Sequence, residues 1–347
     1  MLPVKQRIPY KASAAWNLLN SIFVIYKPAL THYLSVRDTI IKHICRDLNE
    51  MEVRPPDNYV VIEGKTNEKL EVIVRPNYAD DELVVGPRYQ YNDISLSAAN
   101  RLSIDTSGVL ICGINGGNSL INKIRESKPS RYYRLKGILG QATNNHFKTG
   151  KIIEKSTYKH IKRAHIDKIC ASMQSSHQKK MFEICGVDIQ SQTAYELAVQ
   201  GLIRPAHSEI PVLYEIKCIN FQPPEFTLEI ICINEYEQYL KTLIHELGLE
   251  LHSTATCTQI QCFKYGLFEL QHALLSKKWD ILSILNNMKI CTKILKENDY
   301  LIEQTNPILV DNKSESSDLS LNFVNLSFIL YLFGHCCIFI LFAITLF

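Results

Sequence analysis

Strand pairs and helices alternate along this chain without a repeated strand–helix–strand order, and this limits the fold more than any other feature. Short apolar runs at residues 108–114 and 133–139 read as buried strands. The other predicted elements are strand pairs at 59–62 with 70–74, 213–220 with 226–233 and 256–262 with 267–270, and helices at 159–173, 193–199, 236–247, 279–288 and 290–296. This order favours an α+β fold, with a mixed, largely antiparallel central sheet and flanking helices, over a doubly wound parallel sheet.

The composition is that of a folded protein. Hydrophobic residues make up 46% of the chain and charged residues 21%, which excludes disorder of the whole chain. With 347 residues, it can hold one large domain or two ordinary ones. The 11 cysteines form no C-x-x-C pair and no Cys–His set with zinc spacing, so we predict no metal site and expect buried thiols in a reducing compartment.

Positive charge is concentrated in one part of the chain. Residues 121–180 carry 15 Lys and Arg but only three acidic residues, a net charge of +12, so the remainder of this +3 chain sums to −9. Such a segment suits a polyanion, because each neutralised phosphate releases counterions. The sequence therefore predicts contact with RNA or DNA, and the alternative is an ordinary solvated surface. The candidate contacts are Lys27, Lys136, Lys148, Lys162, Arg163, His177, Lys179 and Lys180.

The first 20 residues read as a leader. They contain Lys5, Arg7 and Lys11, and the first acidic residue is Asp38. A basic start without acids, rich in Ser and Ala, is typical of a mitochondrial presequence. The alternative is an unstructured leader. We expect the folded domain to occupy residues 21–300 and a polar linker to occupy 301–320.

The last segment, 321–347, is hydrophobic. Phe323–Phe347 contains no Lys, Arg, Asp or Glu and is long enough to cross a bilayer. Two interpretations remain open for it, a tail anchor that contacts a membrane and a non-native extension from a misread gene end.

Five blocks in order along residues 24–270 resemble the TruB-type pseudouridine synthase family. The runs SHQK at 176–179 and GLIRP at 201–205 resemble its mitochondrial branch, and we recognise no C-terminal PUA domain. No single block is decisive, but their order and spacing together are specific. The blocks are Val24–Thr39 with its Tyr-Lys-Pro, Arg101–Leu110, Arg131–Gly150, Tyr195–Pro205, and Lys241–Phe268 with HELGLEL.

The resemblance implies a pseudouridine synthase catalytic fold and conversion of uridine to pseudouridine without a cofactor. In this family the target uridine is everted from its stack. An ionised Asp acts on it beside a basic partner that lowers the pKa of the Asp, and an aromatic ring packs against the base. We therefore expect a monomer that modifies mRNA, rRNA or tRNA in the mitochondrial matrix.

The residues at the implied catalytic positions depart from the family pattern. The family keeps its Asp five residues before the glycine of a G-V-L run, and here that position is Ser103, while Asp105 stands two residues later. The family's basic partner is an Arg, and here it is Lys241, which keeps the charge but loses the bidentate fork. The aromatic position is Tyr133, whose spacing to Gly140 is intact.

These departures leave three hypotheses open. The chain is a pseudouridine synthase with an unusual acid position, for which Asp105 must reach the pocket because the hydroxyl of Ser103 is a poor nucleophile without an adjacent base. Alternatively, it is an inactive RNA-binding homologue that supports mitochondrial RNA processing or translation. A third hypothesis is a membrane-tethered interaction protein that uses Phe323–Phe347.

Overall fold

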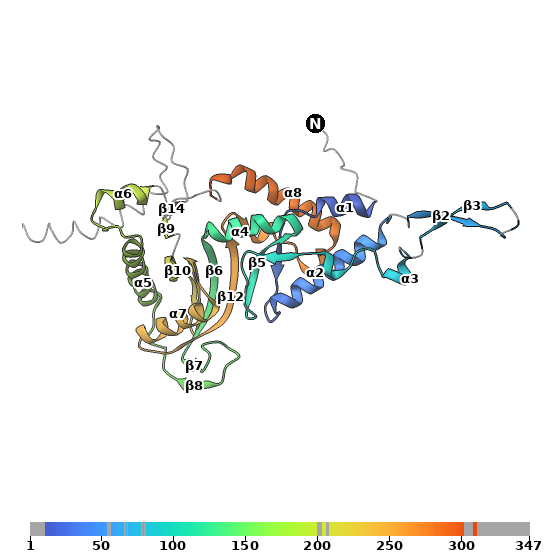
Figure 1. Ribbon diagram of the computed structural model, residues 1–347. Coiled ribbons are helices and arrows are strands. Elements are labelled where there is room, and N and C mark those ends of the chain that lie inside the picture. Colours follow the sequence, from blue (N-terminus) through green and yellow to red (C-terminus); the bar gives the residue numbers. More distant parts are fainter. Residues whose placement is uncertain are drawn as a thin grey trace, which may run out of the picture.

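A mixed central sheet organises the molecule (Figure 1). The computed structural model describes residues 11–53, 57–65, 67, 69–77, 79, 81–199, 203–205, 208–301 and 308–310. The helices are α1 (Ala12–Leu18), α2 (Tyr33–Glu50), α3 (Glu82–Val85), α4 (Asn118–Glu126), α5 (Arg163–Ile184), α6 (Gln192–Val199), α7 (Glu237–Glu250) and α8 (Ile281–Glu297). The strands are β1 (Ile22–Lys27), β2 (Asn58–Glu63), β3 (Glu71–Pro76), β4 (Leu96–Ala98), β5 (Thr106–Ile114), β6 (Arg131–Leu139), β7 (Gln141–Thr143), β8 (Ile152–Lys155), β9 (Ile203–Pro205), β10 (Val212–Gln222), β11 (Glu225–Ile233), β12 (Ala255–Tyr265), β13 (Phe268–Glu269) and β14 (Ile308–Val310).

The central sheet has the order β1-β5-β12-β6-β11-β10, with β4 beside β5 and β13 beside β12. Every pairing in it is antiparallel except β5 with β12. The α+β fold with a largely antiparallel sheet, predicted from the order of the elements, is therefore confirmed. The single parallel pairing joins two strands about 140 positions apart in the sequence, as only a long connection allows.

Three helices pack against strands of the central sheet. The helix α7 packs on β12 and the helix α5 packs on β10, while α8 packs on β1. Apolar residues of α7, including Leu240, Leu243 and Leu247, recur at helical spacing and are at most 2% exposed. This face of α7 therefore places the polar residues at its N-terminal end beside the start of β5.

Gly108 allows β5 and β12 to approach closely. Its φ is +128°, and a Cβ at this position would lie 1.9 Å from the carbonyl oxygen of Cys262. Only glycine combines that backbone conformation with so close a neighbour. The glycine therefore allows the parallel pairing of β5 with β12 at Gly108 and Cys262.

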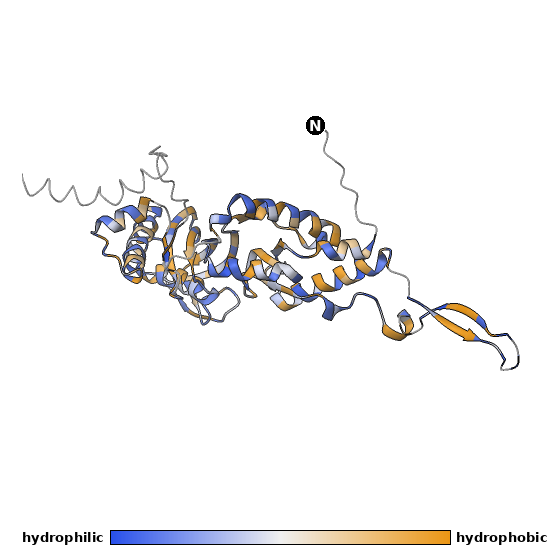
Figure 2. Cartoon of the chain, turned by 45° about the horizontal axis from the view of Figure 1, so that its top comes forward, coloured by the Kyte–Doolittle hydropathy of each residue, from blue (hydrophilic) through white to orange (hydrophobic). Residues whose placement is uncertain are grey.

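The hairpin of β2 and β3 projects from the end of the molecule that carries α2, away from α5 and α6 (Figure 1). Val60, Ile62, Val72 and Val74 are each 61–68% exposed, and the ribbon of both strands is largely orange, the colour of hydrophobic residues, in Figure 2. Such an isolated two-stranded hairpin lacks the packing that normally stabilises a sheet.

Most predicted elements match the structure, with differences at the ends. The predicted helices 279–288 and 290–296 are one helix, α8. Part of the segment predicted as a leader, residues 1–20, is folded, since α1 lies within it and Ala12, Ala15 and Leu19 are fully buried in the core. The linker predicted for 301–320 contains a strand, since β14 pairs with β9.

Residues 1–10 and Phe323–Phe347 lie outside the described residues. Within the part of the chain that the structure describes, no helix combines the length and the apolar character needed to cross a bilayer.

Candidate functional site

A tight turn at residues 103–106 leads into β5, and the side chain of Lys27 binds carbonyl oxygens of this turn. Lys27 ends β1 opposite Gly108 and is fully buried. Its ammonium donates to the carbonyl oxygens of Ser103 and Thr106, both at 2.8 Å, and more weakly to those of Pro28 and Ile104. Because one cation binds several carbonyls of the turn, the backbone around Asp105 has a defined conformation.

Asp105 and Lys241 form an ion pair at the edge of this turn. The Nζ of Lys241 lies 2.7 Å from Oδ2 of Asp105, and the two side chains are 8% and 17% exposed, respectively. Lys241 sits in the first half of α7, so the pair joins α7 to the start of β5. A charge-assisted hydrogen bond of this length, largely removed from water, gives the carboxylate a fixed position.

A second carboxylate shares the same ammonium. Glu237 precedes Lys241 by one helical turn, and its Oε1 lies 2.8 Å from the Nζ of Lys241. Its other oxygen accepts a hydrogen bond from the Thr106 hydroxyl at 2.8 Å. An i,i+4 pair with the acid towards the N-terminus is the favourable arrangement on a helix.

An aromatic ring covers the ammonium. The Nζ of Lys241 lies 4.7 Å from the centre of the buried Phe147 ring, within the range of a cation–π interaction. The loop that carries Phe147 is attached to β12, since the amide of Cys257 donates to the carbonyl of His146 and the amide of Lys148 donates to the carbonyl of Cys257. The ring therefore has a fixed place beside the ion pair.

The site contains two cations and two carboxylates. Burial lowers the pKa of Lys27 to about 8, partly offset by Glu237 and Asp105. Burial also lowers the pKa of Lys241, but its hydrogen bonds to Asp105 and Glu237 outweigh this and raise the pKa overall. The Lys241 ammonium therefore stays protonated at neutral pH and places a positive charge beside Asp105.

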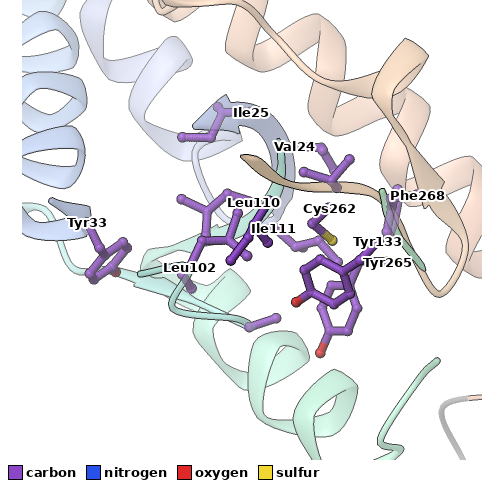
Figure 3. Packing of buried hydrophobic residues seen from close by; sticks show 14 of the residues in the cluster. Val24, Ile25, Tyr33, Leu102, Leu110, Ile111, Tyr133, Cys262, Tyr265 and Phe268 are labelled. Atoms are coloured by element: carbon purple, nitrogen blue, oxygen red, sulfur yellow. The ribbon is translucent and has the colours of Figure 1, made fainter. Parts of the chain in front are cut away.

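Tyr133 lies on the same face of the sheet as this cluster. Thr106 is opposite Ile260, Ile260 is opposite Leu135, and Tyr133 is two residues from Leu135. Tyr133 is 3% exposed and packs beside Cys262 and Tyr265, as Figure 3 shows.

The hydroxyl of Tyr133 donates to Oε1 of Glu235 at 2.6 Å, and Arg131 binds the same oxygen. Burial, followed by the charge of Glu235, raises the pKa of Tyr133 well above its ordinary value. The phenol therefore stays protonated, and this hydrogen bond fixes the ring.

The structure brings Asp105 and Lys241 together and places Ser103 elsewhere. Ser103 is exposed, and the turn uses its backbone carbonyl rather than its side chain to bind Lys27. Within the described residues, no group of three or more His, Cys, Asp or Glu side chains could hold a metal ion. A cavity of about 480 Å³, lined by Tyr132, Phe263 and Lys264 among others, lies away from the ion pair.

Two of the predicted RNA contacts have other roles in the structure. Lys27 is fully buried and binds carbonyls of the turn, so its ammonium does not reach a phosphate. His177 is half-buried on α5, and its Nε2 lies 3.4 Å from the Tyr239 hydroxyl of α7. Burial lowers the pKa of His177, so it is neutral at pH 7. The other predicted contacts are exposed, namely Lys136, Lys148, Lys162, Arg163, Lys179 and Lys180.

Sequence analysis missed Glu237, Thr106 and Phe147. The pairing of Glu237 with Lys241 could have been predicted, because an acidic residue four positions before a basic residue on a predicted helix lies on the same helix face. No such pattern marks Thr106 or Phe147, since their contacts depend on how the sheet brings distant segments together.

Replacing Lys27 by Met is expected to remove a pH dependence of stability. The pKa of Lys27 is about 8 in the folded chain against an ordinary value of 10.5, so between these pH values the unfolded chain binds more protons and stability rises with pH. From about pH 7.5 to about pH 9.5, the unfolding free energy of the wild type should rise by about 2 kcal/mol relative to the variant. Denaturant titrations of both proteins measure this, and equal pH responses would contradict it.

A family model and several curated proteins match this chain. Residues 99–236 match the TruB family pseudouridylate synthase (N terminal domain). The chain is 40% identical over 289 residues to the mitochondrial pseudouridylate synthase TRUB2 of Xenopus tropicalis, an alignment that covers 81% of this chain and 88% of that protein. It is 34% identical over 287 residues to the human protein of the same name, with 81% and 86% covered.

Solved structures give a more distant likeness. The archaeal box H/ACA sRNP Nop10-Cbf5 complex contains a chain that matches with a TM-score of 0.41 and 10% identity. The match covers 82% of this chain and 60% of that chain.

Proposed function

The chain belongs to the TruB family of pseudouridine synthases, in the branch of the mitochondrial relatives, and on that premise we propose that it is an active enzyme. It isomerises uridine to pseudouridine in RNA, and Asp105 is its catalytic carboxylate. The observation that supports this proposal is the 2.7 Å ion pair between Asp105 and Lys241, the residue at the family's basic position. The catalytic acid has moved two positions along the chain and keeps its partner.

The chemistry requires a carboxylate and no cofactor. The bond from N1 of uracil to C1′ of ribose breaks, the base turns, and a bond from C5 to C1′ forms while C5 loses a proton and N1 gains one. Asp105, in contact with the Lys241 ammonium, acts on the sugar or the base as the first bond breaks. The everted base packs against Tyr133, whose ring is 3% exposed, so this contact requires the residues that cover the ring to move.

A single-turnover assay tests the proposal. Purified protein is mixed with a stem-loop RNA labelled with tritium at C5 of uridine, and release of the label reports the loss of the C5 proton. We expect release from one position of the RNA, to an extent set by the amount of RNA when the enzyme is in excess. Binding of the RNA without any release would reject the proposal.

The second candidate is an inactive homologue that binds RNA and supports mitochondrial RNA processing or translation. Two observations favour it, the serine at position 103 and the lysine in place of arginine at position 241. It predicts tight RNA binding without tritium release.

We propose that RNA approaches across a basic loop next to the site. Lys148 directly follows Phe147, and Lys151, Lys155 and Lys162 are also exposed in the segment through β8 that leads to α5. Phosphate contacts of this kind orient the RNA without reading its sequence. Lys136, Arg163, Lys179 and Lys180 are further proposed contacts, and the target is mitochondrial mRNA, rRNA or tRNA in the matrix.

Reversing the charge of Lys148 and Lys151 together to Glu should weaken RNA binding about tenfold in about 0.15 M salt. Two lost phosphate contacts should also lower the slope of log K against log salt by about 1.4 for single-stranded RNA. The rate at saturating RNA should change little. The control is Lys296→Glu, an exposed residue of α8, a helix that lies on the opposite side of the molecule from β7 and β8 in Figure 1. An equal loss of RNA affinity in the control variant would reject the proposal that RNA approaches across this basic loop.

A further inference from the structure

We propose that Glu237 is a positioning residue that holds the Lys241 ammonium against Asp105 and so replaces the second nitrogen of an arginine fork. The inference rests on the proposed function, in which Asp105 is the catalytic carboxylate. Glu237 lies on α7 and is not at one of the catalytic positions that the family resemblance implies.

A lysine at this position needs a second anchor. An arginine binds a carboxylate through two nitrogens in one plane, which fixes both distance and direction, whereas a lysine is a point charge on a flexible stem. Here the ammonium lies 2.7 Å from Asp105 and 2.8 Å from Glu237. Two oxygens on different segments, together with the Phe147 ring at 4.7 Å, hold the ammonium in one place.

Glu237 is itself anchored to the turn that carries Asp105. The carboxylate oxygen of Glu237 that does not bind Lys241 accepts a hydrogen bond from the Thr106 hydroxyl at 2.8 Å. Thr106 directly follows Asp105 in the chain. The contacts therefore close a ring, from Asp105 to Lys241, to Glu237, to Thr106 and back through one peptide bond. A ring of this kind resists displacement of any one member, and misplacement of a reacting group by about 1 Å can cost about a hundredfold in rate.

The position of Asp105, rather than its charge, depends on Glu237. Glu237→Gln removes a negative charge but leaves the Lys241 ammonium available to Asp105, so no positive charge is lost beside Asp105. A loss of rate in Glu237→Gln would therefore be a loss of geometry. Its signature is a lower kcat, an unchanged KM for RNA, and no rise in the pH at which activity is lost on the acidic side.

The kinetic test compares Glu237→Gln with its rescue. We expect Glu237→Gln to lower kcat about tenfold. In a Lys241→Arg background, where the fork orients itself, the same change should cost less than about threefold. The control is Glu250→Gln, an exposed residue at the other end of α7, which should leave kcat unchanged. Wild-type kcat in Glu237→Gln, or an equal loss in both backgrounds, would overturn the proposal.

A second measurement separates this inference from the proposed function. The titration of the Lys241 side chain is followed by NMR of its 13Cε in the wild type, Glu237→Gln and Glu250→Gln. We expect the midpoint to fall in Glu237→Gln only, because a hydrogen-bonded carboxylate that raises the pKa of Lys241 is lost. If the wild type converts no uridine, the proposed function fails while this titration still decides whether Glu237 holds Lys241. An unchanged midpoint would overturn the inference even in an active enzyme.

Discussion

Replacing Asp105 by Asn should lower the single-turnover rate of pseudouridine formation by at least about a thousandfold, as removal of a group that acts directly on the reacting atoms does. Asparagine keeps the shape of the side chain and can still accept a hydrogen bond from Lys241, so the turn should remain folded. Only the negative charge is lost, and that charge is what the proposed chemistry uses. The rate is measured with saturating enzyme, and the Kd for the stem-loop RNA is measured beside it.

The matched control for this change is Asp167→Asn. Asp167 is exposed on α5 and pairs with Arg163 one helical turn away, a contact of little energetic weight. The control should keep the wild-type rate, and both variants should bind RNA as the wild type does. If Asp105→Asn retains more than about a tenth of the wild-type rate, Asp105 is not the catalytic group.

Replacing Lys241 by Met should lower the rate by about a hundredfold to a thousandfold, the usual effect of losing one charged group that stabilises a reacting carboxylate. Methionine can fill the space of the lysine stem, but it leaves Asp105 and Glu237 facing each other without the ammonium between them. Lys27 cannot replace it, because its own ammonium is bound to the carbonyls of the turn.

The pH dependence of the Lys241→Met variant provides its own signature. Two carboxylates that share a site repel, so the pKa of one of them rises. Residual activity should then disappear at a higher pH than in the wild type as the solution is acidified. The rates are measured across about pH 5–8, with Lys168→Met on the exposed surface of α5 as control. An acid limb identical to that of the wild type would show that the two carboxylates do not interact.

Much of the fold could be predicted because the sequence patterns are local. The hairpins around Gly64–Asn67 and Tyr265–Gly266 have turn residues between two apolar runs, and both occur in the structure. The helix α7 followed from its apolar spacing, although it continues beyond Gly248 to Glu250. The two pieces expected at α8 are one helix, because Lys289 between them continues the helix without a break.

The candidate site was predictable only in part. The choice between Ser103 and Asp105 depends on the conformation of a four-residue turn, and that conformation depends on carbonyl contacts to Lys27, a residue 76 positions from Ser103. Sequence spacing therefore identified the right segment but not the residue in it that contacts Lys241. Lys27 was misread as a surface contact for the same reason, since its burial follows from the sheet order β1-β5-β12.

The most direct test of the proposed function moves the carboxylate from position 105 to position 103. Single-turnover rates are measured for the wild type, for Ser103→Asp and for Ser103→Asp combined with Asp105→Asn. The wild type should convert uridine, and the double variant should stay inactive, because the side chain at 103 is exposed while that at 105 meets Lys241. An inactive wild type that gains activity on Ser103→Asp would contradict the account and assign the chain to the silent RNA-binding homologues.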